Sequence, residues 1–192
     1  ILSDGIPWTD QLTCNDGLNC IAQQWLFCVA CALLYDGGGK VAVSVLILAT
    51  WAAAAWAVYG ACRAAGASKR ASSAHCAAAL IVSSVYVKTN PRGIDVACLM
   101  LSCQAVLEWL DGRGRRALLV PVACSAALAN LHCTMWPVAA IPIACALVDP
   151  RTAGRRRELL LSLALTTAAS MCSPYGIWST LYVFVSMSGG LS

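Results

Sequence analysis

Residues 41–62 read VAVSVLILATWAAAAWAVYGAC, and this run indicates the class of fold. It contains no charged side chain. A helix of about 20 apolar residues crosses the roughly 30 Å hydrocarbon layer of a bilayer, and this run has that length. A helix is required because every backbone polar group inside lipid must find its hydrogen bond within the segment. The run therefore predicts an α-helical membrane protein.

The composition of the whole chain leads to the same class. Apolar residues make up 59% of its 192 residues and charged residues only 11%, whereas soluble domains carry roughly 25% charged residues. So few charges cannot cover the surface of a water-soluble fold of this size. The composition therefore excludes a soluble domain.

Charges and turn residues divide the remaining sequence into further apolar segments, most of them shorter than the first. Short spans can recruit flanking residues or sit in a locally thinned bilayer. We expect one all-α domain over residues 1–192, a polytopic transmembrane helix bundle of about seven spans. After residues 41–62, the expected spans are residues 73–87, 94–110, 118–131, 136–148, 159–172 and 177–187.

The region before the first span, residues 1–40, combines a polar head with a short apolar run. Residues 20–35 form this run, and Asp36-Gly37-Gly38-Gly39 is expected to end it. We expect a juxtamembrane helix in the first external loop, with Trp25 at headgroup depth. The alternative is a tilted span, which would move the polar head to the cytoplasm. Residues 41–192 would hold the transmembrane helices.

Basic residues indicate the orientation of the expected spans. Three connections hold ten of the thirteen lysines and arginines, at residues 63–70, 113–116 and 151–157. Two apolar segments separate each connection from the next, so all three should lie on one side, which the positive-inside rule makes cytoplasmic. We expect a multi-pass protein of the bacterial cytoplasmic (inner) membrane. The basic runs are explained as topology signals, so nucleic acid is not an expected partner.

The opposite, external side collects the candidate substrate-binding residues. A guanidinium at Arg92 can grip a phosphate with two hydrogen bonds, and the imidazole of His132 can hold a phosphate or relay a proton. The alternatives are a lipid-headgroup contact for Arg92 and a solvated helix cap for His132. The same side is expected to carry Lys88, Asn130 and Tyr175.

Tryptophans are expected at both membrane interfaces, because their rings prefer the headgroup region. Trp136 and Trp178 should lie at the external interface and Trp109 at the cytoplasmic one. These positions would frame the bundle between two aromatic belts.

The order of several motifs also resembles a known family. The opening Ile1-Leu2-Ser3-Asp4-Gly5-Ile6-Pro7-Trp8-Thr9-Asp10 resembles the first external loop of GT-C-type glycosyltransferases. Gln24-Trp25-Leu26 and the following glycines are similar to the continuation of that loop in bacterial members. Three later motifs agree in order and predicted side: Asn90-Pro91-Arg92-Gly93, Asn130-Leu131-His132 and Ser173-Pro174-Tyr175-Gly176.

The resemblance implies a membrane transferase that takes a sugar from a polyprenyl-phosphate donor on the external face. In such enzymes an aspartate of the first external loop deprotonates the acceptor, and basic residues stabilise the departing phosphate. The resemblance makes Asp10 or Asp4 the catalytic base and turns Arg92 and His132 toward the phosphate. It adds to this substrate site Asn130, Lys88 and Tyr175. The sequence specifies no cofactor and leaves a divalent metal open.

A non-enzymatic polytopic protein is the alternative, either a transporter or a flippase-like lipid carrier. Transporters place ionisable residues near mid-span, often at broken helices, whereas the expected span centres here are almost free of charge. Membrane lipids are expected partners under both hypotheses. Because Ile1 is not an initiator methionine, we expect an internal fragment that is inactive alone.

Overall fold

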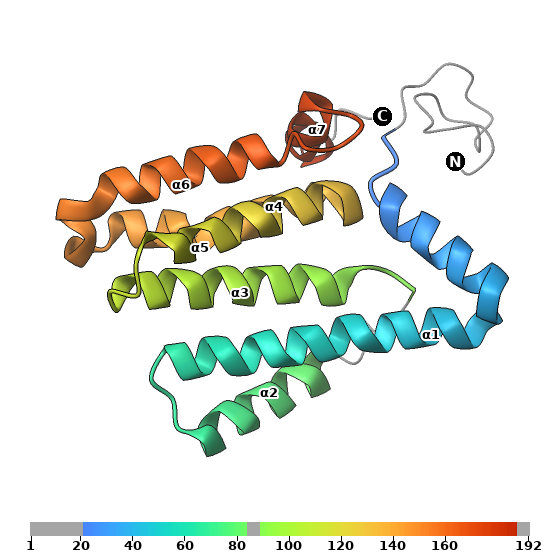
Figure 1. Cartoon of the computed structure of the whole chain (residues 1–192), viewed down its shortest axis with the longest axis horizontal. Coiled ribbons are helices and arrows are strands. Elements are labelled where there is room, and N and C mark those ends of the chain that lie inside the picture. The colour runs from blue at the N-terminus through green and yellow to red at the C-terminus, as the bar shows by residue number, and fades with distance from the viewer. Residues whose placement is uncertain (1–20, 84–88, 188–192) are drawn as a thin grey trace.

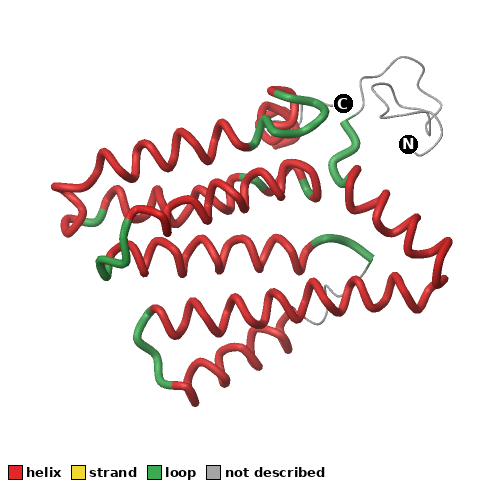
Figure 2. Tube along the Cα trace, in the orientation of Figure 1, coloured by secondary structure: helices red, strands yellow, loops and turns green. Residues whose placement is uncertain are grey.

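A computed structural model describes residues 21–83 and 89–187 of the chain. In this part the regular structure is helical, with seven α-helices, three short 3-10 helices and no strand (Figures 1 and 2). The predicted all-α class is therefore confirmed for the described residues. The α-helices are α1 Trp25–Ala64, α2 Lys69–Ser83, α3 Arg92–Leu110, α4 Leu119–Leu131, α5 Pro137–Val148, α6 Arg156–Ala169 and α7 Ile177–Met187.

Helix α1 consists of two arms that change direction at Gly39 (Figure 1). The backbone of Gly39 has φ 60° and ψ −152°, a conformation that glycine adopts without the clash of a Cβ atom. The first arm covers the short apolar run that was expected to be helical. The prediction that the helix would end at Asp36 was wrong, because Asp36, Gly37 and Gly38 remain helical. One residue produces the bend, and the second arm continues directly from it.

The second arm of α1 packs against α3, which in turn contacts α4 and α5, and α6 covers α4 and α5 on the other side; α2 packs back against α1 (Figure 1). The three basic connections lie together at one end of this bundle, at the left of Figure 1. We call it the arginine end; it comprises residues 63–70, 111–118 and 149–157. The other end, which carries the α4–α5 turn, is called the His132 end. Alternating chain direction therefore gathers the basic residues, as the sequence predicts.

Two helices of the described part, α1 and α3, are long and apolar enough to cross a membrane. A third span results if the segments Cys133–Val148 and Pro150–Ala169, which are bent by 104° at their junction, count as one. The other helices have 11 to 15 residues. At 1.5 Å per residue they extend for about 16–23 Å, less than the hydrocarbon layer. By length and composition the structure supports two or three spans, fewer than the seven expected.

Small residues fill the contacts between helices. Ala57, Ala105 and Ala139 are almost completely buried, as are Ser102 and Ser125. Large apolar side chains instead lie on the outside of the described part, among them Val41, Leu48, Trp56, Ile81, Leu161 and Phe184. Small and hydroxyl side chains allow close approach of helices in lipid, whereas an exposed apolar surface of this kind is unusual for a soluble monomer.

The expected aromatic belts are found only in part. Trp178 is 58% exposed, as an interfacial residue should be. Trp109 is completely buried, and its indole Nε1 donates a hydrogen bond to Glu158 Oε2 at 2.9 Å. Trp136 is also buried and packs in a core cluster with Leu128. For Trp109 and Trp136 the prediction of an interfacial position was wrong, because both rings are packed between helices.

The backbones of α1 and α3 approach each other closely at Gly93, near the His132 end. A Cβ atom on Gly93 would lie 2.7 Å from Thr50 Oγ1 and 2.9 Å from the carbonyl carbon of Thr50. Glycine at this position therefore lets the first turn of α3 contact α1 directly. That contact positions the side chains of the first turn, which include Arg92 and Asp95.

Candidate functional site

A largely buried contact between the Asp95 carboxylate and the His132 imidazole lies at the His132 end. The Nδ1 atom of His132 is 2.8 Å from Oδ2 and 3.0 Å from Oδ1 of Asp95. The side chains are 8% exposed for His132 and 13% for Asp95. Thirty-seven residues separate the two in sequence, and they come from different helices. A carboxylate and an imidazole withdrawn from water in this way are strongly oriented by each other.

The local backbone structure places the side chains of His132 and Asp95 where they can contact each other. His132 ends α4 with φ −159° and ψ 77°, and its backbone N–H still donates to Leu128 O at 2.8 Å. Its carbonyl accepts from the Met135 N–H at 2.9 Å, which turns the chain into α5. Asp95 lies in the first turn of α3, where a negative charge interacts favourably with the helix dipole.

The geometry distinguishes the two ring nitrogens of His132. Because Nδ1 faces the carboxylate of Asp95, it carries a proton and donates to that carboxylate. Nε2 is the ring nitrogen that does not face Asp95. A carboxylate that orients a histidine through its other nitrogen is a recurring arrangement in acid–base and anion-binding sites.

Arg92 and Asp95 border one small open cavity of about 200 Å³. Arg92 is the first residue of α3, and its backbone N–H donates to the Asn90 side-chain oxygen at 3.3 Å. Asp95 therefore contributes to the cavity wall and to the His132 contact at the same time. The other lining residues are Trp51, Ser83, Val96 and Met135.

Asn130 and Tyr175 lie at the same end, and both connect segments that are distant in sequence. Asn130 Nδ2 donates to the carbonyl oxygens of Ala126, at 2.9 Å, and Cys172, at 2.6 Å, so it joins α4 to the α6–α7 connection. Tyr175 is 2% exposed, and its hydroxyl accepts from the Ala22 N–H at 3.1 Å. Both side chains therefore hold the turns around the candidate site in place.

The segment before α1 is bonded to this end as well. Gln23 Nε2 donates to the Tyr182 hydroxyl at 3.0 Å, and the Gln23 carbonyl accepts from the Cys133 N–H at 2.8 Å. Cys133 directly follows His132. The first described residues therefore enter the fold beside the Asp95–His132 pair.

Three expected site residues, Asp4, Asp10 and Lys88, lie outside the described residues. The other four lie on elements that meet at the same end of the bundle (Figure 1): Arg92 at the start of α3, Asn130 and His132 at the end of α4, and Tyr175 in the turn before α7. Residues 21–83 and 89–187 contain no group of three histidine, cysteine, aspartate or glutamate side chains arranged to hold a metal ion.

Asp95 was not among the site residues predicted from the sequence. The available signal was a carboxylate inside the apolar run that begins at Ile94, where a charge is costly and often functional. Its partner could not be identified from the sequence, because the pairing depends on how α3 and α4 lie against each other. Comparisons with protein families, with curated proteins and with solved structures found no match to this chain.

Proposed function

We propose that the chain forms the membrane-embedded part of a glycosyltransferase that takes its sugar from a polyprenyl-phosphate donor. The observation that carries the proposal is the buried Asp95–His132 pair, placed beside Arg92 at the bundle end opposite the arginine-rich connections. A lipid-linked phosphate requires a polar site at membrane level, next to an apolar surface. The His132 end combines both features.

In this proposal the donor phosphate meets Arg92 and Nε2 of His132. Arg92 supplies a guanidinium that can bind phosphate oxygens bidentately. Asp95 holds the His132 ring so that Nε2 points to one position. These groups would stabilise the negative charge that develops on the phosphate as the sugar bond breaks. Asp10 or Asp4 would take the proton of the acceptor hydroxyl, in the role of a general base.

The proposal includes a multi-pass arrangement in a bacterial cytoplasmic membrane, with about seven spans. The exposed large apolar side chains on several helices support lipid contact for more than α1 and α3. The shorter helices would be matched by a thinned bilayer and by flanking residues. The arginine end would face the cytoplasm and the His132 end the external side.

Binding of undecaprenyl phosphate to the full chain in lipid nanodiscs tests the site. This probe contains the phosphate and lipid of the donor, so the measurement does not depend on the sugar. Arg92→Gln should weaken binding by about tenfold, the effect of one charge-assisted contact. The matched control is Arg70→Gln, which removes an exposed arginine at the arginine end. Equal affinity of wild type and Arg92→Gln would remove Arg92 from the proposed site.

A proton-coupled carrier is the second candidate, and the same ion pair favours it. Buried carboxylate–imidazole pairs also serve as proton relays in membrane transport. The two functions differ in what they need from Arg92: a carrier would keep its pH-dependent proton uptake in Arg92→Gln, whereas lipid-phosphate binding would fall. Measuring both quantities in the same proteoliposomes separates the two proposals.

A further inference from the structure

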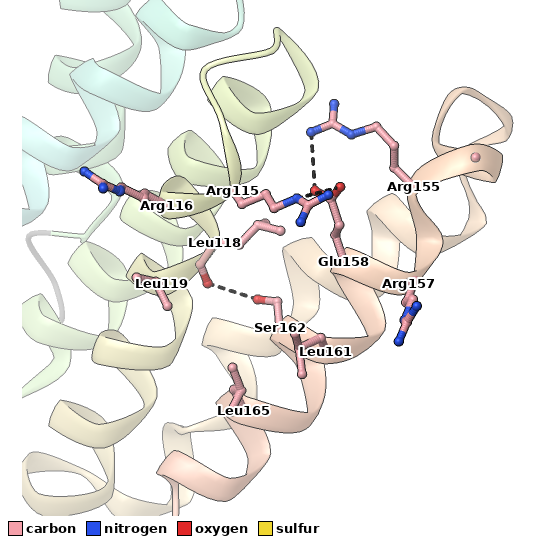
Figure 3. A pocket seen from close by; sticks show the side chains of 11 residues that line it. Arg115, Arg116, Leu118, Leu119, Arg155, Arg157, Glu158, Leu161, Ser162 and Leu165 are labelled. Carbon is pink, nitrogen blue, oxygen red and sulfur yellow. Dashed lines mark hydrogen bonds and ion pairs between the residues drawn. The ribbon is translucent and has the colours of Figure 1, made fainter.

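The arginine end contains a second polar cluster, centred on Glu158 in the first turn of α6. Its carboxylate accepts from Trp109 Nε1 at 2.9 Å, lies 3.0 Å from Arg115 Nε and 3.5 Å from a terminal nitrogen of Arg155. The Arg155 guanidinium also lies 4.0 Å from the ring centroid of Trp109. Glu158 therefore holds two guanidinium groups together at one place (Figure 3).

The guanidinium groups of Arg115 and Arg155 line an open groove of about 620 Å³. The groove is formed by α4, α6 and the connections that precede these helices. Arg116 and Arg157 also line the groove, on opposite sides of it, and their side chains extend away from Glu158 and from each other (Figure 3). Neither forms an ion pair with another residue of the described part. Four arginines against one glutamate leave the groove with a clear excess of positive charge.

The rest of the groove is apolar and extends along the two helices. Leu119 of α4 is 57% exposed, and Leu161 and Leu165 of α6 are 62% and 42% exposed. Ser162 Oγ donates to the Leu118 carbonyl at 3.0 Å and joins the two sides at the base of the groove. Positive charge at one side and exposed leucines beside it match a molecule with an anionic head and an aliphatic tail.

We propose that this groove binds an acidic glycerophospholipid. Its phosphate would meet the remaining N–H donors of Arg115 and Arg155, which Glu158 holds together, and its acyl chains would lie over Leu119, Leu161 and Leu165. Arg116 and Arg157, on opposite sides of the groove, would attract the anionic headgroup through their charge. Basic pockets between helices near the cytoplasmic leaflet have this chemistry. The site lies at the opposite end from the sugar-donor site and does not depend on sugar transfer.

Native mass spectrometry of the full chain in a neutral detergent measures this binding directly. Dioleoyl phosphatidylglycerol should bind the wild-type protein at lower concentration than dioleoyl phosphatidylcholine, with one preferred bound lipid. The double variant Arg116→Gln/Arg157→Gln should weaken phosphatidylglycerol binding by about tenfold or more. Inorganic phosphate at millimolar concentration should not displace the lipid, because it lacks the acyl chains.

The control double variant Arg70→Gln/Arg156→Gln removes the same net charge from exposed residues outside the groove. It should change phosphatidylglycerol binding by less than about twofold. Equal weakening in both double variants would overturn the site, since only the total charge would then matter. Displacement by inorganic phosphate, or equal binding of both lipids by the wild type, would also overturn it. None of these outcomes affects undecaprenyl phosphate binding at Arg92, so the two proposals fail separately.

Discussion

At the scale of single residues, the main finding is that His132 has a buried acidic partner. The contact with Asp95 uses Nδ1 of the imidazole ring. Four expected substrate-binding residues lie at the same end, but they differ in what they contact. Asn130 and Tyr175 bond to backbone atoms of distant segments, whereas Arg92 and Asp95 border the cavity. Asn130 and Tyr175 therefore support the site, and Arg92 at the cavity is best placed to meet an anionic ligand.

Removal of the Asp95 carboxylate should destabilise the fold because it leaves the His132 imidazole buried and unpaired. We expect Asp95→Ala to lower the free energy of unfolding by about 2–3 kcal/mol, in line with the loss of one partner of a buried polar pair. Thermal unfolding in detergent measures the effect. In a double-mutant cycle with His132→Ala, the two losses should not add, since each variant removes the same interaction. Additive losses would mean that the two side chains do not interact.

At the scale of elements, two glycines have different roles along α1 and α3. Gly39 provides a backbone conformation that bends α1, and a Cβ atom there would meet no atom within 4 Å. Gly93 provides space instead, because a Cβ atom would overlap Thr50. The first role is conformational and the second is steric, so substitutions at the two positions test different causes.

Gly39→Ala should destabilise the protein by about 1–3 kcal/mol, because alanine rarely adopts this backbone conformation. Gly37→Ala is the matched control. Gly37 is helical, and its Cβ atom would also meet nothing within 4 Å, so alanine should stabilise the helix by about 0.5–1 kcal/mol. Melting temperatures in one detergent compare the two variants. If both changes had the same sign, the bend at Gly39 would not be a fixed feature of α1.

Gly93→Ala should cost about 1–3 kcal/mol, because the new methyl group would push α3 away from the backbone of α1. Gly60→Ala serves as the comparison within the same helix pair. There the added Cβ would meet the end of the Gln104 side chain, which can rotate away. Gly93→Ala should also weaken undecaprenyl phosphate binding, since it displaces the turn that carries Arg92. An unchanged melting temperature for Gly93→Ala would contradict the close crossing.

At the scale of the whole molecule, the two ends of the bundle differ in charge. Basic connections lie at one end, and the Asp95–His132 pair lies at the other (Figure 1). Between them, large apolar side chains are exposed on several helices. This distribution supports the proposed membrane arrangement, in which the two ends would face water on opposite sides and the middle would face lipid.

Reporter fusions test this orientation in a bacterial host. Alkaline phosphatase fused within residues 111–114 should be inactive, because its disulfides do not form in the cytoplasm. The same enzyme fused within residues 172–174 should be active. Fusions of green fluorescent protein at the two positions provide the converse control. Active phosphatase at residues 111–114 would reverse the orientation and place the proposed donor site on the cytoplasmic side.

Much of the secondary structure followed from local sequence. Residues 94–110 and 118–131 were expected to be helical and correspond closely to α3 and α4. Glycines and charges between apolar runs marked the ends of α3 and α4, but they did not end the first arm of α1, where Asp36 and Gly37 remain helical. The grouping of basic residues at one end also followed from counting helices between them. These properties depend on neighbouring residues in the chain, so they can be read without a structure.

Contacts between residues that are distant in sequence could be identified only from the tertiary structure. Asp95 and His132 are 37 residues apart, and Trp109 and Glu158 are 49 apart. Neither pairing has a local signal, because each depends on the rotation and shift of one helix against another. The same packing buries Trp109 and Trp136. From residue type alone, both tryptophans were predicted to lie at a membrane interface. Local chemistry thus determined which segments are helical and where their charges lie, while helix packing determined which polar groups meet.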